Sequence, residues 1–168
     1  MSKELKEKNL FTCGIISLSD RSFRGERPDS TGPNAVTVME RFGYRVEEFI
    51  LIPDDYDKIV DTLNYYANVR KLNLVITCGG TGFGKRDNTP EATMAVAERL
   101  APGIPEAIRA YSLQFTPNAM LSRAVCGIKG ETVILNMPGN PKACEQIMAH
   151  IHVALAHGIE TLLGIADE

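Results

Sequence analysis

The chain has 168 residues, of which 44% are hydrophobic and 23% charged, and its formal net charge is −3. This balance is typical of a globular domain of ordinary size. No stripe of Lys and Arg suggests a nucleic-acid partner, and no apolar run is long enough to cross a bilayer, so we expect a cytoplasmic protein without membrane contact. We expect residues 1–9 to be a flexible, charged leader and residues 10–168 to form a single domain.

Strands and helices alternate through the first hundred residues. Apolar runs predict strands at residues 11–18, 44–52 and 72–76, and helical spacing predicts helices at residues 33–42, 54–69 and 90–100. Pro33 and Pro90 stand in the first helical turn, which proline tolerates, while Asp54 and Asp55 are expected to cap the second helix.

The rest of the chain predicts a helix, a hairpin and a long final helix. The helix spans about residues 105–113, the hairpin strands are 124–128 and 132–137, and the amphipathic last helix begins at Pro141. Alternating strands and helices imply a mostly parallel sheet that is covered on both faces. We therefore expect an α/β fold, a three-layer α/β/α sandwich in which the hairpin supplies one antiparallel edge.

The glycine-rich stretch at residues 77–91 carries the strongest functional signal. Its four glycines, at positions 79, 80, 82 and 84, follow a buried strand and are expected to expose a row of backbone N–H groups to phosphate. Lys85 and Arg86 add positive charge, and Asp87 adds a carboxylate able to hold a hard cation. A plain turn is the alternative, but it does not need this combination. The stretch thus favours a metal–nucleotide or another phosphorylated ligand.

Two better-known phosphate loops do not fit this stretch. Gly79, Gly84 and Lys85 match the body of a P-loop, but Arg86 stands where that motif needs a magnesium-binding Ser or Thr. The dinucleotide pattern G-x-G-x-x-G finds no match either. A generic P-loop NTPase is therefore disfavoured.

Three aspartates are predicted to converge at one edge of the sheet. Ligands of open α/β sheets bind beyond the carboxyl ends of the strands, and this rule gathers the loops at residues 19–20, 53–54, 79–87 and 138–141. Asp20, Asp54 and Asp87 lie in these loops. Each has a structural alternative, which is a turn for Asp20, a helix N-cap for Asp54 and a loop hydrogen bond for Asp87.

The cysteines and histidines indicate no metal centre. Cys13, Cys78 and Cys126 lie in apolar strand-like runs and no C-x-x-C pair occurs, so we expect reduced thiols in the core. The three histidines all fall in the last predicted helix without a carboxylate that completes a zinc-type set. We expect them at the surface or at an interface.

At these residues the sequence resembles the MogA/MoaB family of molybdenum-cofactor biosynthesis, and within it the molybdopterin adenylyltransferase branch and the gephyrin-type domains. The resemblance covers about residues 11–163. The matching pieces are Ser19-Asp20, Pro53-Asp54, residues 79–82, Arg86-Asp87, residues 89–92, Thr116-Pro117, residues 120–123, Gly127-Ile128 and residues 136–141.

The resemblance implies a MoaB/Mog-like fold and a reaction with Mg²⁺, in which the terminal phosphate of molybdopterin attacks the α-phosphate of ATP. By resemblance, Asp54 and Asp87 are the required carboxylates, and we assign them to Mg²⁺ and ATP positioning. Thr81 and Ser122 would hold the molybdopterin phosphate. The other implied substrate contacts are Ser19, Asp20, Gly79, Gly80, Gly82, Arg86, Pro138, Gly139 and Asn140. Lys85, Arg86, Arg123 and Lys142 could equally be surface charges.

The same resemblance leaves one alternative open. Relatives often carry a proline-containing pair at Gly84-Lys85, but the metal carboxylate is intact, and the Arg86-Asp87 pair favours the adenylyltransferase branch over the MoaB branch. The alternative is a non-catalytic molybdopterin-binding or oligomeric scaffold protein of the MoaB branch. The family also implies a homotrimer and a separate downstream protein for molybdate insertion.

Overall fold

The structure is a computed structural model that describes residues 11–166, so the leader expected at residues 1–9 lies outside the described part. The strands are β1 (Thr12–Leu18), β2 (Arg45–Ile52), β3 (Leu74–Cys78), β4 (Arg99–Leu100), β5 (Cys126–Lys129) and β6 (Thr132–Met137). The α-helices are α1 (Asp20–Phe23), α2 (Thr31–Arg41), α3 (Tyr56–Asn64), α4 (Thr89–Val96), α5 (Gly103–Ser112) and α6 (Pro141–Leu162). A π-helical turn, Tyr65–Val69, extends α3, and Pro117–Leu121 is a 3₁₀ helix.

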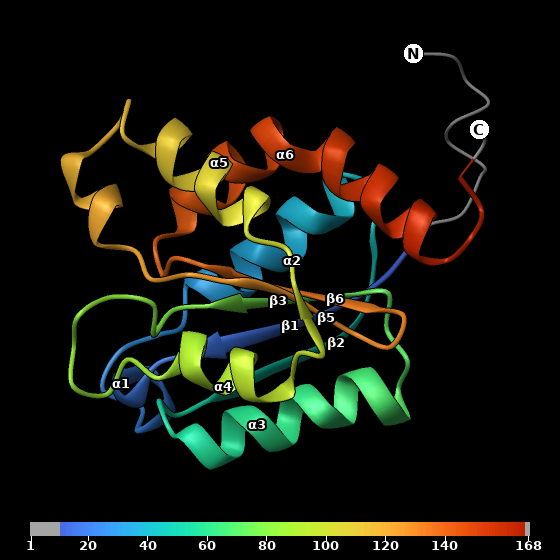
Figure 1. Cartoon of the computed structure of the whole chain (residues 1–168). Coiled ribbons are helices and arrows are strands. Elements are labelled where there is room, and N and C mark those ends of the chain that lie inside the picture. Colours follow the sequence, from blue (N-terminus) through green and yellow to red (C-terminus); the bar gives the residue numbers. More distant parts are fainter. Residues whose placement is uncertain (1–10, 167–168) are drawn as a thin grey trace.

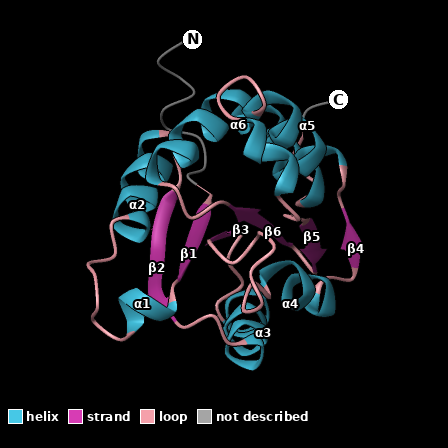
Figure 2. Ribbon diagram, turned by 90° about the vertical axis from the view of Figure 1, so that its left-hand side faces the viewer, coloured by secondary structure: helices cyan, strands magenta, loops and turns pink. Residues whose placement is uncertain are grey.

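The six strands form one sheet between two layers of helices (Figure 1). Helices α2, α5 and α6 cover one face, and α3 and α4 cover the other (Figure 2). The strand order is β2-β1-β3-β6-β5-β4, in which the first four strands are parallel and the last two are antiparallel to their neighbours. The predicted three-layer fold with an antiparallel edge is confirmed.

Alternation along the central strands separates two hydrophobic cores. In β3, Leu74 and Ile76 pack toward the layer of α2, α5 and α6, while Val75 between them packs toward α3 and α4. All five residues of β3 are buried, because a central parallel strand is covered on both faces. The rigid sheet that results fixes where the loops at its carboxyl edge begin.

The predicted element boundaries hold for most of the chain but fail after α4. Residues 97–100 were expected to continue that helix, and this prediction is wrong: Arg99–Leu100 form β4, which pairs with Gly127 and Ile128. The backbone N–H of Glu98 also donates to the carbonyl of Ile128 at 2.8 Å. Pairing with β5 outweighs a local helical preference that no proline or glycine interrupts.

The expected state of the cysteines is confirmed. Cys13, Cys78 and Cys126 are free and buried, and so is Cys144 on α6. Within residues 11–166, no helix is both long enough and apolar enough to cross a membrane.

Candidate active site

An open hollow of about 510 Å³ lies where β1, β2 and β3 end. Nine of the residues expected at the site line it: Ser19, Asp20, Asp54, Gly79, Gly80, Thr81, Gly82, Asp87 and Gly139. They come from four loops that are far apart in sequence, and the parallel strands bring these loops together at one edge of the sheet.

Asp20 and Asp54 hold the first two loops together by exchanging hydrogen bonds. The backbone N–H of Asp20 donates to Oδ2 of Asp54, and the backbone N–H of Asp54 donates to Oδ1 of Asp20, both at 3.0 Å. Asp54 does not cap α3, because Asp55 does so by accepting the N–H of Lys58 at 3.0 Å. The capping role expected for Asp54 is therefore wrong, and its carboxylate faces the hollow.

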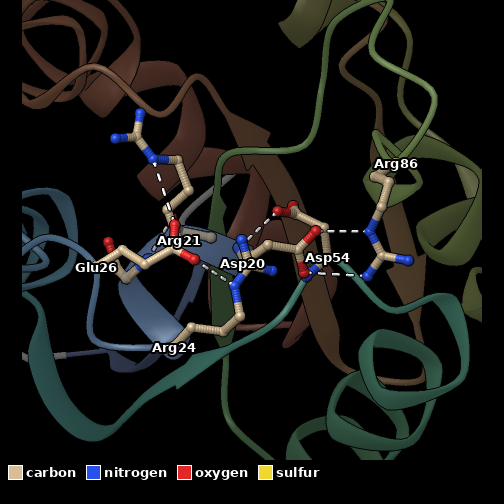
Figure 3. A network of polar contacts seen from close by, with 8 residues as sticks. Asp20, Arg21, Arg24, Glu26, Asp54 and Arg86 are labelled. Carbon is tan, nitrogen blue, oxygen red and sulfur yellow. Dashed lines mark hydrogen bonds and ion pairs between the residues drawn. The ribbon is translucent and has the colours of Figure 1, made fainter.

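Arg86 makes a two-point ion pair with Asp20. Its Nε and Nη2 donate to Oδ2 and Oδ1 of Asp20 at 2.6 and 3.0 Å (Figure 3). The bonds from Arg86 hold the pKa of Asp20 below its ordinary value. Burial, together with the charges of Asp20 and Asp87, raises the pKa of Asp54. The pKa values of Asp20 and Asp54 thus shift in opposite directions, because within residues 11–166 only Asp20 of the two pairs with an arginine.

Two glycines at the end of β3 are required by close backbone contacts. Gly79 and Gly80 have φ angles of 109° and 65°, which L side chains rarely adopt. A Cβ on Gly79 would lie 2.6 Å from the carbonyl oxygen of Leu18, and one on Gly80 would lie 2.3 Å from Oγ1 of Thr89. These contacts pack the loop tightly against β1 and the start of α4.

The loop after β3 exposes fewer N–H groups than its composition predicts. Gly82 and Gly84 donate to Oδ2 of Asp87 at 3.1 and 3.0 Å, and Gly79 donates to the carbonyl of Met137 at 3.0 Å. The prediction that all four glycines expose their N–H groups is therefore wrong. Asp87 satisfies two of them itself, so the loop hydrogen bond considered for it is real and fixes the position of its carboxylate.

Arg123 fixes this loop from the opposite side. Its Nε donates to the carbonyl of Gly82 and its Nη2 to the carbonyl of Asp87, both at 2.7 Å, while its Nη1 pairs with Glu91 at the start of α4. Its backbone N–H also donates to the carbonyl of Thr81 at 2.8 Å. Arg123 is therefore a residue that positions the loop rather than a free surface charge.

The acidic residues of the hollow are suited to a hard divalent cation whose remaining ligands come from a substrate. Within the described chain, no hydrogen bond reaches Oδ1 of Asp54 or Oδ1 of Asp87, and no group of three His, Cys, Asp or Glu side chains forms a complete cage. Mg²⁺ needs no such cage, because it commonly takes one or two carboxylates together with substrate phosphates. Burial raises the pKa of Asp54, and so does repulsion from Asp20 and Asp87, which a cation would relieve.

Four residues of the expected site do not line the hollow: Arg86, Ser122, Pro138 and Asn140. Ser122 ends the 3₁₀ helix, and its Oγ accepts the N–H of Ala124 at 3.3 Å. Asn140 caps α6 by accepting the N–H of Lys142 at 3.1 Å. Pro138 and Asn140 flank Gly139, which does line the hollow, so they border it.

Three arginines that the sequence did not indicate as site residues also line the hollow: Arg21, Arg24 and Arg27. They belong to α1 and the turn after it. Their regular spacing of three, directly after a strand that ends at the predicted edge, was the available signal. It was missed because the segment reads as a polar loop.

Known proteins resemble this chain over most of its length. Residues 14–157 match the family described as "Probable molybdopterin binding domain". The molybdopterin adenylyltransferase of Haemophilus influenzae is 42% identical over 143 residues, which are 83% of this chain and 72% of that protein. The molybdopterin adenylyltransferase of Escherichia coli K12 is 38% identical over 162 residues, covering 90% of this chain and 80% of that protein. The crystal structure of MoaB from Thermus thermophilus, described as a molybdopterin biosynthesis enzyme, has a TM-score of 0.86 at 38% identity and covers 94% of this chain and 99% of its own.

Proposed function

We propose that this chain, which belongs to the molybdopterin-binding domain family of molybdenum-cofactor biosynthesis, is a molybdopterin adenylyltransferase. It transfers the AMP group of ATP to the terminal phosphate of molybdopterin. A phosphate oxygen of molybdopterin forms a bond to the α-phosphorus, and the bond from that phosphorus to the bridging oxygen breaks. Adenylyl-molybdopterin and pyrophosphate are the products.

The observation that carries this proposal is that Asp54 and Asp87 line the same hollow, although they come from different strand ends. A phosphate must approach a triphosphate there, and two like charges about 5 Å apart repel by roughly 3 kcal/mol at an effective dielectric near 20. Asp54 and Asp87 would hold Mg²⁺, which neutralises phosphate charge and polarises the α-phosphate when it is bound. The hydrogen bonds that Gly82 and Gly84 donate to Asp87 preorganise one of these carboxylates.

The remaining residues hold the substrates. Thr81 contributes its hydroxyl to the molybdopterin phosphate, and Ser122 lies at the end of the neighbouring 3₁₀ helix, on the side of the loop that Arg123 fixes. Asp20 acts through Arg86, which it holds at the rim of the hollow. Ser19 and Gly139 border the nucleotide side.

A transfer assay tests the function directly. The full chain, incubated with ATP, MgCl₂ and molybdopterin, is expected to form adenylyl-molybdopterin and release pyrophosphate, and chelation of Mg²⁺ should stop the reaction. The variant Asp87→Asn tests the charge of this carboxylate alone. Its amide oxygen can still accept the N–H groups of Gly82 and Gly84, while the charge is lost. Arg41→Gln is the control, since Arg41 pairs with Glu145 on the exposed surface of α2 and α6.

The same assay addresses the scaffold alternative. A non-catalytic protein of the MoaB branch would bind molybdopterin without releasing pyrophosphate from ATP. Full activity of Asp87→Asn would instead remove the role given to that carboxylate and leave the enzyme assignment in place. We further propose that the protein is a cytoplasmic homotrimer and that it passes its product to a separate molybdate-insertion protein. Sedimentation of the full chain measures the oligomeric state.

A further inference from the structure

The arginines of α1 and the following turn have no role in the site described so far. Arg21, Arg24 and Arg27 all line the hollow, and Arg27 reaches back to donate from Nη2 to Oγ of Ser19 at 3.3 Å. Solvated surface charges need not gather on one wall of a cavity. These three do so from a segment of seven residues.

The charges of the hollow are separated in space. Its lining contains three arginines, all from residues 21–27, and three aspartates. Asp54 and Asp87 belong to the end of β2 and to the glycine loop, and Asp20 is already neutralised by Arg86. Figure 3 shows Asp20 and Asp54 in the middle, with Arg21 and Arg24 on one side and Arg86 on the other. An elongated polyanion that extends from the carboxylate of Asp54 toward α1 therefore meets a cationic wall, formed by the arginines of residues 21–27.

Glu26 pairs with two arginines of this cationic wall, where a phosphate group could bind instead. Its Oε1 accepts from Nε of Arg24 at 2.7 Å, and its Oε2 lies 3.8 Å from Nε of Arg21 (Figure 3). The side chains of Arg24 and Glu26 are 57% and 46% exposed. Ion pairs this exposed are weak, whereas a phosphate can take two guanidinium donors at once. A bound phosphate chain can therefore replace Glu26.

We propose that Arg24 and Arg27, together with Arg21, form the subsite for the β- and γ-phosphates of ATP and for the pyrophosphate that leaves, with Glu26 as a built-in competitor. The inference rests on the proposed function, and it fixes the direction in which ATP lies in the hollow. The α-phosphate lies near Asp54 and Asp87, and the terminal phosphates point toward α1. When the bond from the α-phosphorus to the bridging oxygen breaks, its electron pair stays on pyrophosphate, and the arginines stabilise that charge.

Binding measured by calorimetry on the full chain, with inorganic pyrophosphate, ATP and AMP as probes in the presence of MgCl₂, tests the subsite. The double variant Arg24→Gln/Arg27→Gln is expected to weaken pyrophosphate and ATP binding by roughly tenfold or more, the equivalent of losing about one charged hydrogen bond. AMP affinity should change less than about twofold, because AMP has no terminal phosphates. Glu26→Gln should tighten pyrophosphate binding by roughly threefold, and Arg41→Gln should change none of the affinities.

Each result decides between the alternatives. Unchanged pyrophosphate affinity in the double variant, or an equal loss for AMP, would overturn the subsite, and unchanged affinity in Glu26→Gln would overturn the competition. The transfer assay on the unsubstituted chain runs in parallel. Transfer without arginine-dependent binding refutes this inference alone, whereas arginine-dependent binding without transfer refutes the proposed function alone.

Discussion

Asp20 and Asp54 each accept a hydrogen bond from the other's backbone N–H group, so two loops from adjacent strands β1 and β2 are joined through two carboxylates. Arg86 neutralises only one of the pair, by its two bonds to Asp20. Asp54 has no such partner among the described residues, and burial together with the charges of Asp20 and Asp87 raises its pKa. The site thus holds an unfavourable charge in the place where a cation would be needed.

We predict that Asp54→Asn abolishes transfer and stabilises the fold at neutral pH. The amide oxygen can still accept the N–H of Asp20, while the repulsion from two carboxylates is removed. Because the folded-state pKa is raised, the aspartate lowers stability above that pKa and not below its ordinary value near 3.9. The gain should be about 1 kcal/mol or less, since Asp54 is half-buried and solvent screens its charge.

Urea unfolding between pH 7 and pH 4 measures this effect, and the gain should shrink as the pH falls. The control is Asp55→Asn, which removes an adjacent charge but keeps the cap on α3, because asparagine caps as well as aspartate. A gain of equal size in both variants would show that general charge, rather than the position of Asp54, is responsible.

The convergence of Asp20, Asp54 and Asp87 was predictable because strand order alone brings loop ends together in a parallel sheet. Which of the two neighbouring aspartates caps α3 was not predictable, since Asp54 and Asp55 have the same side chain and differ only in backbone direction. Likewise β4 has two residues and exists only by pairing with β5, so no local pattern marks it.

The glycine loop shows the same limit. Its composition predicted a phosphate cradle, but two of its N–H groups bind Asp87, a contact made possible by the turn itself. The role of Arg123 was equally hidden, because it acts on a loop that ends 36 residues earlier in the chain. Sequence reasoning predicted which loops meet at the hollow but could not assign the hydrogen-bond partners inside it.

A buried hydrogen-bond network around Asn136, near the carboxyl end of β6, should be essential for stability. Asn136 on β6 donates from Nδ2 to Oγ1 of Thr77 at 3.0 Å and to Oγ1 of Thr93 at 2.9 Å, and its Oδ1 accepts the N–H of Val125 at 3.1 Å. Asn136→Leu keeps the size of the side chain but leaves these partners unsatisfied, so we expect a loss of about 2–4 kcal/mol in the free energy of unfolding.

Urea unfolding with an unchanged m-value would measure this loss. Met137→Leu, at the next and equally buried position of β6, is the matched control and should cost less than about 1.5 kcal/mol. Similar losses in the two variants would mean that packing, not hydrogen bonding, determines the effect at Asn136.

The four cysteines should not react in the folded protein. Burial raises the pKa of Cys126 and Cys144 to about 12, and it also raises the pKa values of Cys13 and Cys78 well above the ordinary range. The thiolate is the reactive form, so both its population and its access are low at about pH 8. A coloured thiol reagent should label the native chain negligibly and all four sites after denaturation in urea. Rapid labelling before unfolding would contradict this expectation.

Arg123→Lys should loosen the glycine loop and lower the rate of transfer. A lysine carries its three N–H donors on one nitrogen, whereas Arg123 bonds to Gly82, Glu91 and Asp87 from three separate nitrogens, so one ammonium group cannot reproduce this spacing. Unsatisfied carbonyls and a mobile Asp87 should reduce kcat by roughly 10- to 100-fold, and the loss of partly buried hydrogen bonds should cost about 1–3 kcal/mol of stability.

Two measurements separate positioning by Arg123 from simple destabilisation. Hydrogen exchange of the amides of Gly82 and Gly84 should accelerate in Arg123→Lys, because both donate to Asp87. The matched control is Arg41→Lys, which should leave the exchange and kcat unchanged, since Arg41 makes only an exposed ion pair with Glu145. If kcat falls in Arg123→Lys at a temperature where the protein stays folded while the exchange of both amides is unaltered, Arg123 acts on the substrate and not through the loop.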